Sequence, residues 1–282
     1  MPTYIFPGQG SQVKGMGKEL FSQFPKITAE ADAILGYSIA TLCVEDPHQH
    51  LNQTQYTQPA LYTVNALSYS SKLHQVGKPP NFVAGHSLGE YNALLAAGVF
   101  DFGTGLKLVK KRGELMSQAV GGAMAAVIGL SIDTIKAILK QHHLLDVAIA
   151  NYNTVMQTVI SGKAPDIAHA VPLLEKAGAL MVIPLNVSGA FHSPYMRSAQ
   201  EQFVMFLKDF HFSPPKFPVI ANCTASIYQF PDIGNTLATQ MTRPVRWLET
   251  IQYLLSQNKE EIEEIGPGRV LTGLIMRIKN GQ

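Results

Sequence analysis

The chain has 282 residues, of which 46% are hydrophobic and 15% are charged, and its formal net charge is +2 at pH 7. This length suffices for one large domain, or for one domain that carries an inserted subdomain, and the apolar content excludes wholesale disorder. The nearly balanced charge gives no reason to expect nucleic acid or an anionic membrane as a partner.

Cysteine usage and the N-terminus point to a reducing compartment. The two cysteines, Cys43 and Cys223, are too few for a disulfide scaffold and lack the Cys/His spacing of a zinc site, so we expect free thiols and no metal. The first residues, MPTYIFPGQG, lack the basic and apolar regions of a signal peptide. No window holds the roughly 18 uninterrupted apolar residues of a membrane helix. We expect a cytoplasmic protein that contacts no membrane.

Apolar periodicity predicts alternating strands and helices in the first part of the chain. Gly77 is a suitable residue to end a helix, and Pro59 suits a first helical turn. The elements predicted there are strands at 3–6 and 81–85 and helices at 16–34, 57–77, 90–100 and 104–119.

The rhythm changes after residue 122, where strands and helices follow in the order βαββαβ. That order is the split pattern of a ferredoxin-like unit. Its predicted elements are strands at 123–130, 147–153, 154–162 and 179–187 and helices at 131–143 and 164–178. The remaining chain predicts helices at 194–210 and 246–258 and strands at 217–222 and 261–268.

These elements predict an α/β protein of two parts. Residues 1–122 and 188–282 would form a large α/β-hydrolase-like domain around a central, mainly parallel sheet. Residues 123–187 would form the inserted ferredoxin-like subdomain.

The stretch GHSLG, residues 85–89, places a serine between two glycines, after a predicted strand and before a predicted helix. This is the arrangement of a nucleophile elbow, in which glycines relieve a crowded turn. Free N–H groups at the helix start would stabilise a developing oxyanion. Ser87 is therefore a candidate nucleophile, although a short pattern of this kind also fits a structural serine.

A serine nucleophile needs a base, which is most often histidine. Among the nine histidines, His192 follows the loop segment VSGAF, where the predicted small subdomain returns to the large domain. Clefts between domains are where sites gather, so His192 is the candidate base. An ordinary hydrogen-bonded loop histidine is the alternative. The loop FPGQGSQ, residues 6–12, fits no nucleotide-binding pattern and instead predicts a tight turn that presents backbone N–H groups.

Six motifs occur together and in order: FPGQGSQ, TQPAL, GHSLGE, KKRGELM, AFHSPYM and EIGPGRVLTGL. As a set they closely resemble malonyl-CoA:acyl-carrier-protein transacylases, and the resemblance covers essentially the whole chain. The stretches LGYSIATLC and TQYTQPALYTVNALSY look more like the discrete acyltransferases that serve polyketide synthases in trans than like the enzyme of fatty acid synthesis.

The resemblance implies a Ser–His pair without a carboxylate. Ser87 matches the acylated serine and His192 the base, oriented by a main-chain carbonyl that we assign to Arg246. Gln9 and Leu88 match the two backbone N–H donors of the oxyanion hole.

The resemblance also implies a substrate pocket. Arg112 matches the arginine that binds the free carboxylate of the substrate, whereas its position beside Lys110 and Lys111 alone would suggest a surface cation. In this family, a phenylalanine directly before the base, as Phe191 is here, accompanies specificity for malonyl over methylmalonyl. The further pocket positions implied are Gln58, His86 and Asn153.

The expected reaction is ping-pong transfer of malonyl from malonyl-CoA to the phosphopantetheine thiol of an acyl carrier protein, without a cofactor, by a monomer. Three alternatives stay open: the same reaction in fatty acid synthesis, an acyl hydrolase of the same fold, and a catalytically silent partner in a synthase assembly. Related hydrolases are expected to lack the carboxylate anchor, so Arg112 favours the transferase.

Overall fold

The computed structural model describes residues 2–257 and 261–281. Its larger part contains a four-stranded sheet in the order β7-β2-β1-β8. Every neighbouring pair in this sheet is parallel. The strands are β1 (Thr3–Phe6), β2 (Phe82–Gly85), β7 (Val219–Ile220) and β8 (Ile262–Glu264).

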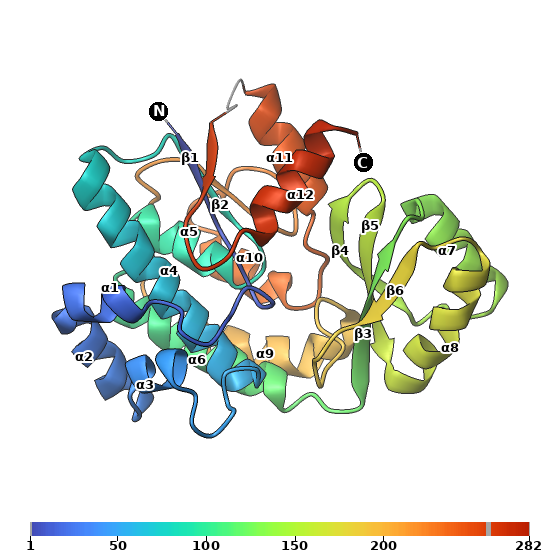
Figure 1. The fold of residues 1–282 in the computed structure, drawn as a ribbon, viewed down its shortest axis with the longest axis horizontal. Helices are drawn as coiled ribbons and strands as arrows, with labels where there is room; N and C mark the ends of the chain where they lie inside the picture. Colours follow the sequence, from blue (N-terminus) through green and yellow to red (C-terminus); the bar gives the residue numbers. More distant parts are fainter. Residues whose placement is uncertain (1, 258–260, 282) are drawn as a thin grey trace.

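Helices cover both faces of this sheet, as a parallel sheet requires (Figure 1). Because successive side chains of a strand point to opposite faces, Tyr4 and Phe6 pack into one hydrophobic core, and Ile5 packs into a second core on the other face. The first core includes residues of α4 (Thr54–Val76), α5 (Gly89–Ala96), α6 (Phe102–Ser117) and α9 (Arg197–Leu207), and the second includes residues of α11 (Trp247–Ser256) and α12 (Val270–Lys279).

Several predicted helix boundaries were wrong. The helix predicted at 16–34 is two helices, α1 (Lys18–Gln23) and α2 (Pro25–Leu35), because a proline cannot continue the helix that precedes it. Helix α4 begins at Thr54, before the predicted start, so Pro59 lies inside it. Helix α6 begins at Phe102 because the Asp101 carboxylate caps it, accepting from Thr104 N at 2.8 Å. The helices that were not predicted are α3 (Ile39–Val44), α10 (Ile233–Gln240) and α12.

The smaller part is an antiparallel sheet in the order β4-β5-β3-β6, with two helices against one face. The chain order is β3 (Gly122–Ile128), α7 (Ile132–Gln141), β4 (Ala148–Thr154), β5 (Gln157–Lys163), α8 (Ala164–Lys176) and β6 (Met181–Pro184). The predicted fold class, including the βαββαβ insertion, is therefore confirmed. The exact boundaries at 123 and 187 stay predictions.

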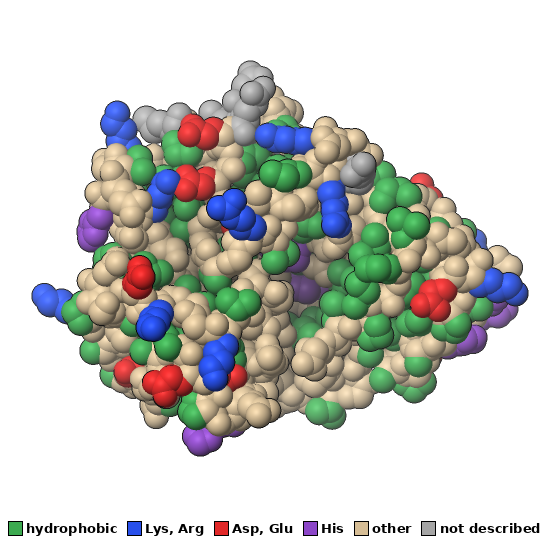
Figure 2. All heavy atoms as spheres, in the orientation of Figure 1, with side chains coloured by type: hydrophobic (Ala, Val, Ile, Leu, Met, Phe, Trp, Pro, Cys, Tyr) green, Lys and Arg blue, Asp and Glu red, His purple; other side chains and the backbone are tan. Residues whose placement is uncertain are grey.

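The two parts meet along β4. Tyr152 N donates to Val245 O at 2.9 Å, and Val245 N donates to Ala150 O at 2.8 Å, so the segment before α11 lies beside this edge strand. Figure 2 shows a hollow between the two parts, with histidine side chains at its floor. None of the helices within residues 2–257 and 261–281 combines the length and the hydrophobicity that a membrane-spanning segment needs.

Candidate active site

Ser87 stands on a strained turn between β2 and α5. Its φ of 52° lies in the left-handed region, which is costly for a residue with a side chain. The flanking glycines are required for space: a Cβ on Gly85 would lie 1.9 Å from the backbone carbon of Gly89, and one on Gly89 would lie 2.0 Å from Phe6 O. The predicted nucleophile elbow is therefore present, and it holds Ser87 just beyond the carboxyl end of β2, an interior strand of the sheet.

His192 lies against the serine. Its Nε2 is 2.7 Å from Ser87 Oγ, and its ring is buried, with 4% of the residue exposed. On the other side of the ring, Nδ1 lies 2.9 Å from Gln240 O and 3.2 Å from Arg243 O. Carbonyl oxygens only accept, so the proton resides on Nδ1 and the lone pair of Nε2 faces the serine hydroxyl.

The carbonyl that orients the base was assigned to the wrong residue. It belongs to Gln240 and Arg243, not to Arg246. Gln240 is the last residue of α10, and the chain turns after it. The end of this helix therefore lies at the imidazole of His192, and Arg246 lies beyond the turn. Arg246 instead donates its backbone N–H to Asn222 O at 2.9 Å and pairs its guanidinium with Glu249.

The surroundings of His192 keep it neutral. Burial is the main cause that lowers its pKa from 6.5 to about 3, and the positive charge of Arg112 adds to this. A neutral imidazole is the form that can accept the serine proton.

Arg112 projects from α6 into the same pocket and is only 1% exposed, so the surface-cation interpretation is wrong. Its Nη1 donates to Gln58 Oε1 at 2.7 Å, and its Nη2 donates to Gln240 Oε1 at 2.9 Å and to Ser87 Oγ at 3.1 Å. The Nε–H has no hydrogen-bond partner. Among the described residues, no carboxylate forms an ion pair with this guanidinium.

These groups line a small pocket of about 90 Å³. Gln9 and Leu88 are at its wall beside Ser87, and within the described part of the chain no hydrogen bond occupies either backbone N–H. That arrangement fits the predicted oxyanion hole. The full lining is Gln9, Gln58, His86, Ser87, Leu88, Arg112, Met116, Met124, Asn151, Leu185, Val187, Phe191 and His192.

The other predicted pocket residues lie as follows. Gln58 and Phe191 line the pocket, and Phe191 is 4% exposed. His86 also lines it, and its Nε2 lies 2.9 Å from Asn153 Oδ1. Asn153 therefore reaches the site through His86, whereas its neighbour Asn151 is the asparagine of β4 that lines the pocket.

Sequence reasoning missed four polar residues here: Glu90, Asn151, Asn222 and Gln240. Glu90 stands in the motif GHSLGE, and an acidic residue in the apolar run of a buried helix is a signal that could have found it. Asn222 ends the strand predicted at 217–222, where nothing marks its side chain as functional, and Gln240 lies in a segment without a predicted element.

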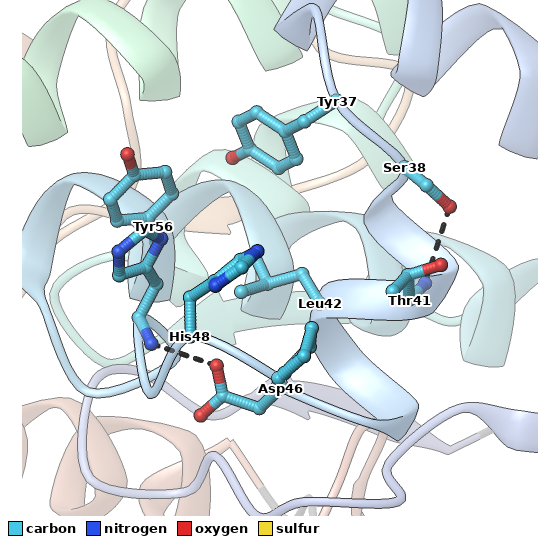
Figure 3. Close-up of a pocket in the computed structure, with 9 residues that line it drawn as sticks. Tyr37, Ser38, Thr41, Leu42, Asp46, His48 and Tyr56 are labelled. Carbon is cyan, nitrogen blue, oxygen red and sulfur yellow. Dashed lines mark hydrogen bonds between the residues drawn. The ribbon is translucent and has the colours of Figure 1, made fainter.

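A larger pocket, of about 350 Å³, lies elsewhere, between α3, the loop that follows it and the start of α4 (Figure 3). His50 stacks on Tyr56 there, with ring centroids 4.6 Å apart, and Ser38 Oγ caps α3 by accepting from Thr41 N at 3.3 Å. Among the described residues, no histidine is hydrogen-bonded to the two aliphatic hydroxyls of this pocket, those of Ser38 and Thr41. The chemistry therefore belongs to the smaller pocket.

Known proteins are similar to this chain in both sequence and fold. The model of the acyl transferase domain family matches residues 3–276. The chain is 56% identical to the polyketide biosynthesis malonyl CoA-acyl carrier protein transacylase PksC of Bacillus subtilis, over 99% of this chain and 97% of that protein. It is 39% identical to the malonyl CoA-acyl carrier protein transacylase of Escherichia coli, over 98% of this chain and 92% of that protein.

A crystal structure of a malonyl CoA-acyl carrier protein transacylase from Burkholderia pseudomallei superposes with a TM-score of 0.97 at 52% identity, covering 100% of this chain and 99% of that chain. A malonyl-transacylase solved in complex with a type II polyketide synthase acyl-carrier protein superposes with a TM-score of 0.94 at 39% identity, covering 99% and 93% of the two chains. The chain therefore belongs to the acyl transferase domain family.

Proposed function

We propose that this protein transfers a malonyl group from malonyl-CoA to the phosphopantetheine thiol of an acyl carrier protein. The observation that carries the proposal is the buried guanidinium of Arg112, which faces the nucleophile Ser87 and pairs with no carboxylate among the described residues. A buried, unpaired cation is costly. A substrate with a free carboxylate would offset that cost, and a fork of N–H donors can hold a carboxylate through two bonds.

The first half-reaction acylates the serine. His192 Nε2 takes the proton of Ser87 Oγ while Oγ bonds to the thioester carbon, and the backbone N–H groups of Gln9 and Leu88 stabilise the oxyanion. The carbon–sulfur bond then breaks. His192 returns the proton to the sulfur, and coenzyme A leaves with its thiol.

The second half-reaction reverses these roles. The carrier thiol gives its proton to His192, its sulfur bonds to the malonyl carbon, and the ester bond to Ser87 Oγ breaks as Oγ recovers the proton. All the catalytic groups come from this chain, and coenzyme A and phosphopantetheine are parts of the two substrates. We propose that the protein works as a monomer in the cytoplasm.

The sequence identities to the relatives support a role in polyketide synthesis. The chain is 56% identical to a transacylase named for polyketide biosynthesis and 39% identical to the Escherichia coli transacylase. Reconstitution with carrier proteins from a polyketide synthase and from fatty acid synthesis would test this part. We expect higher kcat/KM with the former, and equal values would favour the fatty acid alternative.

Intact-mass measurement tests the proposed function. The protein is incubated with malonyl-CoA alone, beside Ser87→Ala and the surface control Ser256→Ala. We expect one malonyl adduct in wild type and in Ser256→Ala and none in Ser87→Ala. Rapid appearance of free malonate would instead identify a hydrolase, and a complete lack of adduct would identify a silent partner or another acyl donor.

A further inference from the structure

Beneath the nucleophile lies a buried carboxylate that the mechanism above does not use. Glu90, in the first turn of α5, is 0% exposed. Its Oε1 accepts from Tyr228 Oη at 2.6 Å and from Asn222 N at 3.0 Å, and its Oε2 accepts from Gln240 Nε2. A buried carboxylate is tolerated only when its hydrogen bonds are made, and here all the donors come from distant segments.

Gln240 is the residue through which this carboxylate reaches the active site. Its Nε2 donates both to Glu90 and to Ser87 O, the latter at 2.9 Å, and its Oε1 accepts from Arg112 Nη2 at 2.9 Å. Its backbone oxygen holds His192 Nδ1 at 2.9 Å. One residue thus touches the nucleophile, the base and the carboxylate anchor.

Asn222 connects the same carboxylate to the elbow. Its Oδ1 accepts from Ser87 N at 2.7 Å, and its Nδ2 donates to Gly85 O at 2.6 Å. The backbone N–H of Asn222 is held by Glu90. The carboxylate therefore supports both sides of the strained turn.

The charges around the Gln240 amide permit only one of its two orientations. With Nε2 toward Glu90 and Ser87 O, every contact pairs a donor with an acceptor. A flipped amide would set its oxygen against a carboxylate and a carbonyl, and its NH₂ against the Arg112 guanidinium, which only donates. The ionised form of Glu90, which prevails above its raised pKa of about 7, is what makes the flipped form unfavourable.

We propose that Glu90 is a positioning residue for substrate selection: it fixes the Gln240 amide with its oxygen toward Arg112, and thereby sets the guanidinium to receive a substrate carboxylate. The Glu90 carboxylate thus acts on His192 and Arg112 through Gln240, and it does not contact the substrate. This inference rests on the proposed function for the identity of that substrate.

The test measures kcat/KM at about pH 8, where Glu90 is mostly ionised, for malonyl-CoA and for acetyl-CoA, which lacks the free carboxylate. Glu90→Gln removes the charge at nearly constant shape, and Gln240→Ala removes the amide but keeps the backbone oxygen that holds His192. We expect each variant to lower the malonyl-to-acetyl ratio by about tenfold, the scale of one hydrogen bond to a charged group. Since both act through the same amide, the double variant should lower the ratio no further than Gln240→Ala does.

Two controls separate positioning from simple loss of stability. Glu249→Gln makes the same change on a half-exposed carboxylate outside the pocket. Ile251→Val weakens the core on the other face of the sheet, where the residue is 0% exposed. Both should keep the wild-type ratio, even where Ile251→Val lowers the melting temperature. A folded Glu90→Gln protein with an unchanged ratio would overturn the inference, as would additive effects in the double variant.

A readout without substrate keeps this test independent of the proposed function. The guanidinium ¹⁵N signals of Arg112, assigned by their loss in Arg112→Lys, should shift in Glu90→Gln and stay in place in Glu249→Gln. If wild type shows no preference for malonyl-CoA while these signals shift as expected, the proposed substrate is wrong and the positioning role stands. Unshifted signals contradict the positioning role whatever the substrate.

Discussion

Ser87 and His192 meet at 2.7 Å across 105 residues of chain, and both hold left-handed backbone, with φ values of 52° and 56°. Two strained residues in contact show that the surrounding structure maintains the pair against local preference. The supports are visible: Asn222 and Gln240 bind the backbone of the serine, and carbonyl oxygens at 240 and 243 bind the imidazole. The dyad is therefore held by amides and carbonyls where other serine enzymes use a carboxylate on the histidine.

Loss of the base should slow acylation without moving its site. His192→Ala should lower the acylation rate by about 10²–10⁴-fold, the usual contribution of a general base. Rapid-quench mass spectrometry with malonyl-CoA measures it. The exposed helix residue His169 provides the control, and His169→Ala should acylate at the wild-type rate. An undiminished rate in His192→Ala would remove His192 from the mechanism.

The anchor should determine which acyl groups are accepted. Arg112→Lys keeps a positive charge but loses the fork, so kcat/KM for malonyl-CoA should fall by about 10–100-fold, equivalent to about 1.5–3 kcal/mol. The value for acetyl-CoA should not fall. Lys107→Ala, on the exposed face of the same helix, is the matched control and should change neither. Equal losses of kcat/KM for both substrates would mean that Arg112 stabilises the fold and does not bind the substrate carboxylate.

Phe191 should restrict the space beside the α-carbon. It lines the pocket with 4% exposure, and its ring contacts Gly189 so closely that a Cβ there would lie 2.6 Å from Phe191 Cε1. Phe191→Ser should raise the methylmalonyl-to-malonyl ratio of kcat/KM by about 10–200-fold, the range for one methyl group in an apolar pocket. Competition between the two thioesters, read by intact mass, measures the ratio. An unchanged ratio would place the restriction elsewhere.

The pH dependence of acylation should reflect a histidine that stays neutral. Because burial and Arg112 lower the pKa of His192 to about 3, the base remains deprotonated as pH falls through 6.5. Pre-steady-state acylation of Glu90→Gln, in which the carboxylate at position 90 no longer titrates, should therefore show no loss with a midpoint near 6.5, for as long as the protein stays folded. If acylation is lost with a midpoint near 6.5, and the midpoint persists when exposed histidines are replaced, His192 does not lie in the environment described here.

Glu90 should make stability depend on pH in the opposite direction to a salt-bridged carboxylate. Burial raises its pKa from 4.5 to about 7, so the folded state binds a proton more tightly than the unfolded state. This contribution to unfolding free energy is largest below pH 4.5 and is lost as pH rises to about 7, by about 3 kcal/mol. The low pKa of His192 produces the opposite slope, in which stability rises as pH goes from about 3 to 6.5.

Chemical denaturation of wild type and Glu90→Gln across pH 4.5–7.5 isolates the Glu90 contribution, because both proteins contain His192. The stability difference, wild type minus variant, should fall as pH rises. A constant difference would show that Glu90 is ionised throughout.

The sequence identified Ser87 through a local motif with a physical cause, and Arg112 only through the resemblance of its motif to a known family. Ser87 needs glycines on both sides for space, and Arg112 was recognised through the motif KKRGELM although its neighbours are lysines. The alternation of helix and strand predicted both sheets, and errors came where one residue decided a boundary, as Pro25 does between α1 and α2.

The supporting groups were out of reach for a different reason. Gln240 and Asn222 act through a backbone oxygen, which any residue could supply, and through side-chain amides that belong to no local motif. Their contacts to Ser87 span 153 and 135 residues. Spacing along the chain does not report such contacts. The resemblance placed the orienting carbonyl on Arg246, a few residues after Gln240 and Arg243, whose carbonyl oxygens bind the imidazole.

The most direct test of malonyl transfer is the fate of the malonyl-enzyme itself. The adduct formed from malonyl-CoA is freed of coenzyme A by rapid gel filtration and divided between buffer and buffer with holo acyl carrier protein. The mechanism predicts an adduct that persists in buffer and passes its malonyl group stoichiometrically to the carrier within seconds. An adduct that decays to free malonate at the same rate in both samples would contradict it and identify a hydrolase.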